Sequence, residues 1–135
     1  MSPKQRTRIA GIIIQDGKLL LLLGKGYKEL WTPGGKIDEG ETDEECLRRE
    51  LREELGVEAT DIKFFKEYKT TSFYNQSITL IERAYIVSIE GEIVPAEEIE
   101  SFVWFTKDDY LTKKYPMITH TQEDLIPDLI KEKIW

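Results

Sequence analysis

The sequence predicts an α/β protein, and three observations support this fold class. Short runs of β-branched, aliphatic and aromatic residues, which are typical of strands, lie on both sides of one segment with helical features, residues 42–56. That segment begins with a capping motif and ends at a glycine. The chain of 135 residues is 40% hydrophobic, which is enough for a buried core, so we expect a single domain over residues 1–135.

Two apolar runs precede the helix, at residues 9–14 and 19–23. The segment between them contains Asp16 and Gly17, a pair that favours a tight hairpin turn, so we expect two paired and largely buried strands. Residues 24–40 hold five of the nine glycines together with a proline. This composition indicates a loop with special backbone conformations.

The predicted helix carries its own start and stop signals. The hydroxyl of Thr42 can accept a hydrogen bond from a backbone N–H of the first turn while the side chain of Glu45 reaches back, which is a capping box. Gly56 suits the left-handed conformation that ends many helices. Leu47 and Leu51 are four residues apart, and this spacing marks the face that we expect to pack on the sheet.

Further strands are expected after the helix, where three more runs rich in β-branched or aromatic residues occur: residues 62–68, 77–89 and 102–105. Residues 106–111 resemble a short capped helix. A last helix is expected at about residues 122–133, but it contains Pro127, which is tolerated in a first helical turn and costly in the interior. This helix therefore either begins near Ile126 or is kinked there.

The composition limits the kinds of partner. The formal net charge is −7, so we expect no extended nucleic-acid surface. The single cysteine, Cys46, excludes an internal disulfide, agrees with a reducing compartment, and is interpreted as a buried filler rather than a nucleophile. The apolar runs are too short to span a membrane. We therefore expect a cytoplasmic protein with no membrane partner.

Three glutamates of the predicted helix, Glu50, Glu53 and Glu54, lie within about one turn. Glu50 and Glu54 are placed one above the other, with Glu53 beside them, so their carboxylates would repel one another if unpaired. Mg²⁺ takes oxygen ligands of this kind and usually keeps substrate phosphates in its remaining positions. The helix is therefore predicted to hold a metal ion against a phosphate.

These glutamates belong to a longer pattern of residue types over residues 35–57. Its specified positions are Gly35, Glu41, Arg49, Glu50, Leu51, Glu53, Glu54, Gly56 and Val57. At every one of them the pattern resembles the signature of the Nudix hydrolases, and the Trp-Thr-Pro-Gly segment before it resembles the usual lead-in. The resemblance implies the family's fold, an α/β/α sandwich with a mixed β-sheet and flanking helices.

The resemblance also implies a reaction, the hydrolysis of a pyrophosphate bond in a nucleoside diphosphate-linked substrate by water, with the help of Mg²⁺ or, in its place, Mn²⁺. Metal ligands are then expected from the backbone carbonyl of Gly35 and the carboxylates of Glu50 and Glu54. Glu53 is either a ligand of a second metal ion or the base that deprotonates water, and the sequence leaves both roles open. A solvated helix face joined by ion pairs would not account for the whole set of spacings.

Arg49 has a glutamate four residues before it and another four residues after it, Glu45 and Glu53. It is expected to orient a carboxylate by bidentate hydrogen bonding, and the resemblance gives it a supporting role in catalysis. Glu41 lies just before the helix, where the resemblance gives it two roles, bracing the loop or reaching the metal ion, and bracing is expected.

One more catalytic or metal-binding carboxylate is expected ahead of Trp104, where the resemblance places such a residue in many family members. The candidates, in order, are Glu98, Glu97 and Glu100. His120 is the only histidine, and it is interpreted as a surface or loop residue, with a phosphate contact as the alternative.

The substrate class is narrowed by residues around and beyond the pattern. Tyr74 lies 17 positions after Val57, where the resemblance links a tyrosine to hydrolases of dinucleoside polyphosphates and a proline to hydrolases of ADP-ribose. Trp31 and Tyr74 are candidates either to stack on a base or to lie in the core. Lys36 is a candidate to meet phosphates, with a solvated loop lysine as the alternative. We therefore expect a small-molecule nucleotide substrate, either a (deoxy)nucleoside triphosphate or a dinucleoside polyphosphate.

A different class of function is a catalytically silent Nudix-like module that senses a nucleotide without cleaving it. Such modules are found attached to DNA-binding modules, and a vestigial site would be indicated by lost glutamates. This chain keeps every acid of the pattern, which favours the enzyme. A homodimer stays open, because many members of the family pair.

Overall fold

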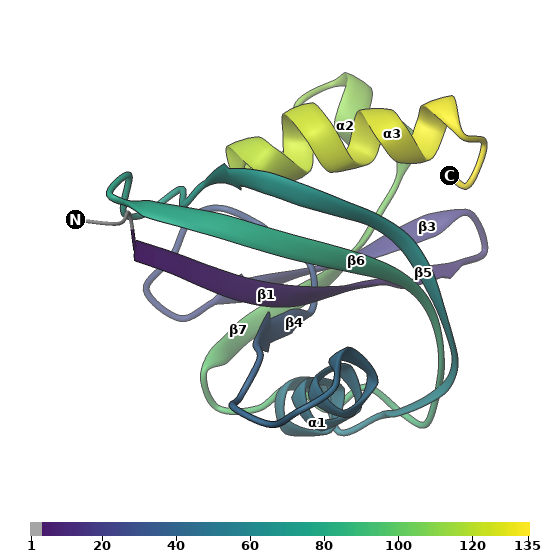
Figure 1. The fold of residues 1–135 in the computed structure, drawn as a ribbon. Helices are drawn as coiled ribbons and strands as arrows, with labels where there is room; N and C mark the ends of the chain where they lie inside the picture. Colours follow the sequence, from purple (N-terminus) through teal and green to yellow (C-terminus); the bar gives the residue numbers. More distant parts are fainter. Residues whose placement is uncertain (1–3) are drawn as a thin grey trace.

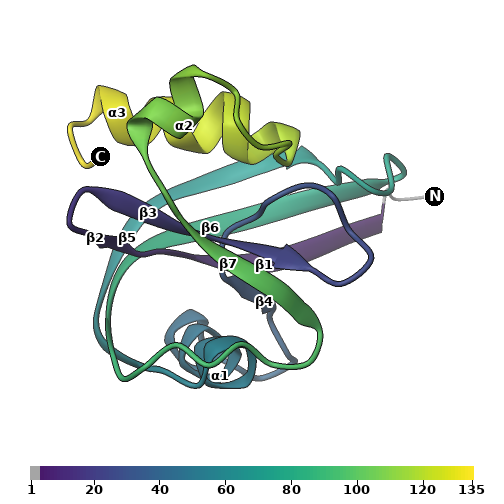
Figure 2. The ribbon, with the colours of Figure 1, turned by 180° about the vertical axis from the view of Figure 1, so that it is seen from behind.

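The structure, a computed structural model, describes residues 4–135. Its elements form three layers, with the strands in the middle, helix α1 (Asp43–Leu55) on one side, and helices α2 (Lys107–Leu111) and α3 (Ile126–Lys131) on the other (Figure 1). The view from behind shows the same layers, with the C-terminus on the side of α2 and α3 (Figure 2). The predicted α/β/α sandwich is therefore confirmed.

The middle layer contains two sheets. The first is mixed and has the order β4 (Gly34–Lys36), β1 (Lys4–Ile12), β6 (Ile78–Glu90), β5 (Glu58–Thr71). In it, β1 and β6 are parallel and the other neighbours are antiparallel. The second sheet is antiparallel and has the order β2 (Ile14–Gln15), β3 (Lys18–Gly24), β7 (Ile99–Phe105).

The first two apolar runs are strands, but their pairing differs from the prediction. The turn at Asp16 and Gly17, whose φ angles are 51° and 75°, joins β2 to β3 as expected. Only this short end of the first run pairs with the second run, because β1 lies in the other sheet between β4 and β6. A tight turn fixes only the residues next to it, whereas every residue of β1 pairs with a residue of β6. The glycine-rich segment, expected as a loop, also contains the short strand β4.

Helix α1 has the predicted ends. Thr42 accepts a hydrogen bond from the N–H of Glu45 at 3.1 Å, and the Glu45 carboxylate accepts one from the N–H of Thr42 at 3.0 Å. Gly56 ends the helix with a φ of 66°. These local signals fix where the glutamates of α1 lie along the chain.

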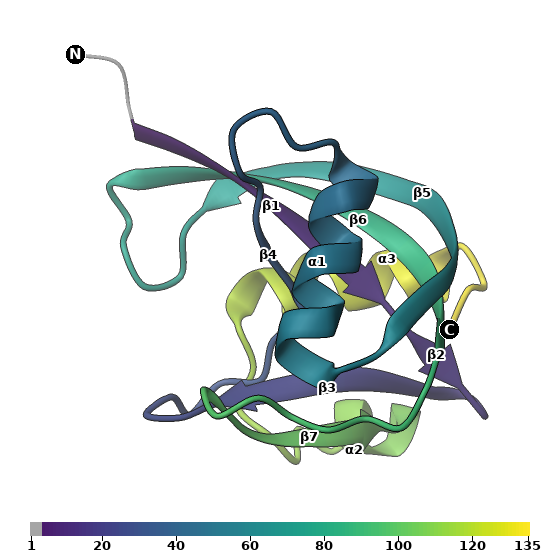
Figure 3. The same ribbon diagram turned by 90° about the horizontal axis from the view of Figure 1, so that it is seen from below.

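Charged side chains anchor α1 to the strands, across which it lies in Figure 3. Asp43 in the first turn of α1 accepts two hydrogen bonds from Arg83 of β6, at 2.6 and 2.7 Å, and one from the hydroxyl of Tyr85 at 2.5 Å. The preceding residue of β6, Glu82, faces the opposite layer, because side chains alternate along a strand, and contacts His120. Strand β6 therefore presents charge to both helical layers.

The C-terminal helix agrees with neither alternative in full. Helix α3 is bounded at Ile126 and has Pro127 in its first turn, but the backbone before it is already helical from residue 119. A π-helical segment, η1 (Thr121–Leu125), runs directly into it. Single π turns of this kind often occur at functional sites. The short capped helix predicted before it is α2.

Apolar side chains form two cores, one on each side of the strands. Leu47 and Leu51 of α1 are fully buried in the first core, as their spacing predicted. The second core lies under α3 and includes Phe105 and Leu129. Across residues 4–135, no helix is both long enough and apolar enough to cross a membrane.

Candidate active site

A cleft of about 830 Å³ brings together residues from β1, from the segment before α1, from the loop between β5 and β6, and from the segment before α3. Its lining includes four carboxylates: Glu54 of α1, Glu82 of β6, Glu98 just before β7, and Asp124. The rings of Trp31 and Tyr74 also line it. The cleft therefore combines carboxylates with aromatic side chains.

Glu54 is the most buried carboxylate of the predicted metal-binding set, with 8% of its surface exposed. Its Oε1 accepts a hydrogen bond from the backbone N–H of Gly34 at 2.9 Å. Burial raises the pKa of Glu54 to about 7, against the opposing effects of the Gly34 N–H and of the Arg8 guanidinium. A buried carboxylate with a raised pKa is stabilised in its charged form by a nearby cation.

Glu50 lies against the backbone of Gly35, the other predicted metal-binding position. A Cβ atom added to Gly35 would lie 2.4 Å from the Cδ of Glu50, so only glycine leaves room for this carboxylate. Burial raises the pKa of Glu50, while the hydrogen bond and charge of Arg49 oppose that shift. The packing of Glu50 against the backbone therefore gives a reason for a glycine at position 35.

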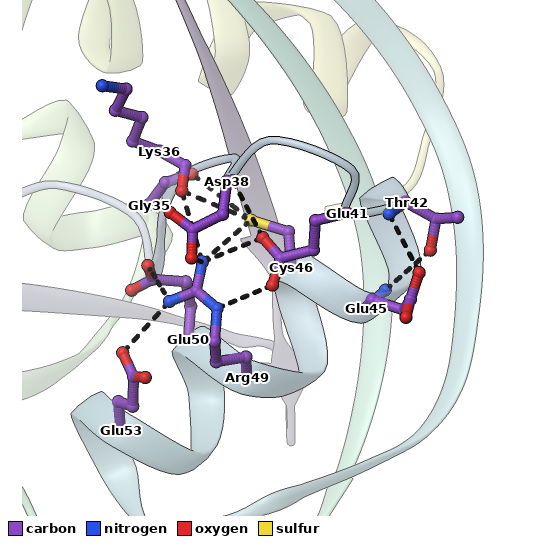
Figure 4. Close-up of polar contacts among 10 residues, drawn as sticks. All are labelled: Gly35, Lys36, Asp38, Glu41, Thr42, Glu45, Cys46, Arg49, Glu50 and Glu53. Atoms are coloured by element: carbon purple, nitrogen blue, oxygen red, sulfur yellow. Dashed lines mark hydrogen bonds and ion pairs between the residues drawn. The ribbon is translucent and has the colours of Figure 1, made fainter.

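Arg49 lies at the centre of the acidic cluster (Figure 4). Its guanidinium binds Glu41 in bidentate fashion, with Nε 2.7 Å from Oε2 and Nη2 3.0 Å from Oε1. Its Nη1 also donates to Glu50 at 2.9 Å and to Glu53 at 3.2 Å. Pairing with Glu53 was expected, but pairing with Glu45 was not found, because Glu45 is held in the capping box. Arg49 therefore orients carboxylates as predicted, with a different partner on one side.

Glu41 braces the loop before α1, as expected. Its carboxylate accepts the two hydrogen bonds from Arg49 and a third from the N–H of Asp38 at 3.0 Å. These hydrogen bonds, with that from Arg49 the strongest, hold the pKa of Glu41 at about 2. Glu41 thus stays charged and ties Arg49 to the loop.

The residues fit a divalent cation, although the described residues 4–135 contain no three acidic, histidine or cysteine side chains already gathered at metal-binding distance. Glu50 and Glu53 point to Arg49, and Glu54 points to the Gly34 N–H. The donors are carboxylate and carbonyl oxygens, which Mg²⁺ and Mn²⁺ prefer. The raised pKa of Glu54 and the contact of the Glu50 carboxylate with Gly35 agree with a cation at this position.

The structure shows which of the other predicted carboxylates line the cleft, and whether the predicted lysine does. Glu98 lines the cleft, whereas Glu97 and Glu100 are not among its lining residues. Lys36 also lines the cleft. Cys46 is buried, and burial raises the pKa of its thiol to about 12, so it is a poor nucleophile.

Aromatic rings gather at the cleft, and one of them was not predicted. The ring of Tyr27 lies 5.1 Å from that of Trp31 and 5.1 Å from that of Tyr74, and all three line the cleft. Tyr74 is 51% exposed, so it is available to a ligand and is not a core residue. Tyr27 was missed because it lies in the glycine-rich segment, where the sequence gives no side-chain direction.

The interpretation of His120 as a surface or loop residue was wrong, because this residue is only 7% exposed. It lies in the cleft wall with Glu82, which is 4% exposed, and with Arg8. These charged residues were not predicted as site residues. The available signals were a glutamate within an apolar strand pattern and an aspartate, Asp124, four residues after the histidine.

The chain matches known proteins along most of its length. The family model described as "NUDIX domain" matches residues 5–129. The chain belongs to the Nudix family. A relative of this Nudix protein, the CTP pyrophosphohydrolase of Escherichia coli strain K12, is 31% identical over 113 residues, which cover 81% of this chain and 80% of the relative. The nucleoside triphosphatase NudI of Escherichia coli O139:H28 is 32% identical over 120 residues, which cover 78% of this chain and 85% of the relative.

Solved structures agree with this Nudix assignment. The solution structure of the E. coli ORF135 protein has a TM-score of 0.71 and 28% identity, and the match covers 88% of this chain and 84% of that one. A NUDIX hydrolase from Nitrosomonas europaea has a TM-score of 0.81 over 96% of this chain and 91% of its own, at 23% identity, which supports the fold alone.

Proposed function

We propose that this Nudix protein hydrolyses a pyrophosphate bond of a nucleoside triphosphate, with Mg²⁺ as cofactor and Mn²⁺ as a substitute. One observation carries the proposal, the cleft that joins the buried carboxylate of Glu54 to the aromatic rings of Trp31 and Tyr74. A carboxylate set suits the metal-bound phosphates of a nucleotide, and aromatic rings suit its base. The single cysteine supports a cytoplasmic protein, and the length of 135 residues supports a single domain.

Each acidic residue has a proposed role. Glu50, Glu54 and the backbone carbonyl of Gly35 would hold the metal ion, and Glu53 would serve as a further ligand or as the base. When bound, the ion would neutralise phosphate charge and lower the pKa of the attacking water. Glu98 lines the same cleft and would accept a proton from that water if Glu53 is a ligand.

Arg49 and Lys36 would act on charge from two sides of the site. Arg49 orients Glu50 and Glu53 through its hydrogen bonds, while Glu41 fixes Arg49 itself. Lys36 lines the cleft and would meet the phosphates of the substrate. These residues supply orientation and charge, which are the main contributions a protein makes to phosphoryl transfer.

The aromatic cluster favours a mononucleotide over a dinucleoside polyphosphate. Within the described residues that line the cleft, Tyr27, Trp31, Phe73 and Tyr74 form one connected cluster, which suits one base. The relatives named CTP pyrophosphohydrolase and nucleoside triphosphatase agree with this choice. CTP is therefore the first substrate to test.

A substrate panel tests the proposal. The protein is incubated with Mg²⁺ and each of the common nucleoside triphosphates, ADP-ribose, diadenosine polyphosphates and triphosphorylated RNA, and the products are separated by anion-exchange chromatography. We expect a nucleoside monophosphate and pyrophosphate from at least one triphosphate. Nucleotide binding without turnover would support the sensing module instead, and turnover of a dinucleoside polyphosphate alone would overturn the choice of substrate.

A further inference from the structure

A chain of polar side chains runs along the cleft wall and has none of the roles proposed above. His120 lies between two carboxylates, with Nδ1 2.9 Å from Asp124 and Nε2 2.6 Å from Glu82. Glu82 accepts a hydrogen bond from Arg8 at 3.1 Å, and Arg8 donates both to the hydroxyl of Thr32, at 2.9 Å, and to its carbonyl. All five residues line the cleft.

The burial of these polar side chains points to a role beyond stability. Glu82 and His120 are almost fully buried, and buried ion pairs often stabilise a fold no better than apolar side chains of the same size. A neutral imidazole has one N–H and can donate to only one carboxylate, so His120 satisfies both Glu82 and Asp124 only as a cation. The side chains therefore form one connected network when His120 is protonated.

The groups packed around His120 agree with the cationic form. Burial lowers the pKa of His120, but the hydrogen bonds and charges of Glu82 and Asp124 outweigh it and raise that pKa above its usual value. The ring of Tyr68 lies 4.7 Å away and is neutral, and its hydroxyl donates to Asp128. The positive charge nearest to Glu82 on the other side is Arg8.

The network ends at the segment that carries the candidate metal site. Thr32 is buried and lies two residues before Gly34, whose N–H is the hydrogen-bond donor to Glu54. The residue between them, Pro33, accepts a hydrogen bond from the N–H of Gly11 at 2.8 Å. The positive charge of Arg8 also acts on Glu54. A change at Arg8 therefore reaches the predicted ligands through one short stretch of backbone.

We infer that Glu82 and His120 are positioning residues, which hold Arg8 on Thr32 and thereby fix the segment that presents Gly34 to Glu54. The catalytic consequence of this inference rests on the proposed function, whereas the structural link does not. Protonated His120 keeps the network whole, whereas neutral His120 can donate to only one of the two carboxylates.

The charge state of His120 can be measured directly, because it is the only histidine of the chain. We expect the imidazole proton signals in NMR spectra of the protein to titrate with a midpoint above about 6.5, the ordinary value for histidine. The midpoint should fall in Glu82→Gln, which removes the negative charge and keeps the shape. A wild-type midpoint at or below the ordinary value would overturn the cationic network.

The structural link is tested through backbone amides in the metal-free protein at one fixed pH near 6.5. In His120→Gln, we expect the amide signals of Gly34 and Gly11 to move from their wild-type positions. Lys66→Gln is the matched control, because Lys66 binds the same C-terminal helix through Asp128, at 3.2 Å, without touching the network. Unchanged Gly34 and Gly11 signals in His120→Gln, or equal movement in Lys66→Gln, would overturn the inference.

Kinetics separate positioning from substrate contact. With the best substrate of the panel, His120→Gln and Glu82→Gln should lower kcat about tenfold or more and change KM much less, as happens when supports of metal ligands are removed. Lys66→Gln should keep wild-type kcat. A rise in KM with kcat unchanged would show that His120 meets the substrate and would refute the positioning role. If no substrate turns over, the proposed function fails, and the NMR tests still decide the structural link.

Discussion

The carboxylate of Glu50 occupies the space that a side chain at Gly35 would fill, since a Cβ atom there would lie 2.4 Å from the Cδ of Glu50. The two residues come from different elements, α1 and β4, and their contact brings a carboxylate and a backbone carbonyl into one small region. The atom that would clash is at the end of a flexible side chain. Glu50 can therefore move aside without disturbing the fold, but its carboxylate would then leave the proposed metal site.

Gly35→Ala should therefore impair activity without unfolding the protein. We expect turnover to fall about 10- to 100-fold, because Glu50 must move away from the site. The free energy of unfolding should change by less than about 1 kcal/mol, which chemical denaturation measures.

Gly34→Ala is the informative contrast to that variant. A Cβ atom at Gly34 would lie 2.0 Å from the carbonyl oxygen of Ile9, and its φ of 132° strains any other residue. This variant should lose roughly 2 kcal/mol or more of stability. Equal stability losses in the two alanine variants would contradict the contacts described for Gly35.

Glu54→Gln should abolish most turnover and yet stabilise the metal-free protein. The loss of a charged ligand is expected to cost orders of magnitude in rate. The pKa of Glu54 is raised to about 7 in the folded state, so its ionisation lowers stability as the pH rises from about 4.5 to about 7. Glutamine removes this loss, which amounts to at most about 3 kcal/mol.

Thermal unfolding at pH 5 and pH 8, with and without Mg²⁺, measures this effect. Metal-free Glu54→Gln should have the higher Tm at pH 8 and little advantage at pH 5, and Mg²⁺ should raise the Tm of the wild type alone. A Glu54→Gln variant that is less stable than the wild type at pH 8 would show that the ionised Glu54 side chain does not destabilise the metal-free protein.

Arg49→Lys should lower turnover about 10- to 100-fold, even though it keeps the charge. A lysine ammonium cannot form the bidentate pair with Glu41 and also reach Glu50 and Glu53. Arg52→Lys is the matched control on the same helix, since Arg52 is exposed and pairs with Glu58 on the surface. Steady-state kinetics of both variants give the comparison, and similar rates in the two would remove Arg49 from the supporting role.

Glu98→Gln should lower kcat, whereas Glu97→Gln and Glu100→Gln should keep wild-type rates, because Glu98 alone of the three lines the cleft. The reduction should be about 10²-fold or more if Glu98 is the base. The pH profile of kcat measures this, since loss of a base removes the acidic limb. Equal rates in all three variants would exclude this segment from the mechanism.

The parts of the fold that were predicted from sequence are those set by neighbouring residues. The capping box of Thr42 and the end of α1 at Gly56 each depend on residues a few positions apart. The division of the first apolar run between two sheets was missed, because the partner of β1 is β6, far along the chain. The spacing of residues along the sequence does not predict which distant strands pair.

The candidate site follows the same rule. The glutamates of α1 and their relation to Arg49 were predicted, because they lie on one helix. The network of Glu82 and His120 was missed, because these residues are 38 positions apart and meet only when β6 and the C-terminal segment pack together. Burial of a lone histidine is decided by such packing and not by its neighbours in sequence.

The alternating charges of β6 also help to fix the register of this strand in the sheet. Glu82 meets Arg8 and His120 on one face, and Arg83 meets Asp43 on the other. A slip of β6 by one residue in one direction would set Arg83 against Arg8, and a slip in the opposite direction would set Glu82 against Asp43. Either misalignment brings like charges together where they are only partly solvated, so both are disfavoured. The register that pairs Glu82 with Arg8 therefore also pairs Arg83 with Asp43, and it positions the cleft wall and helix α1 together.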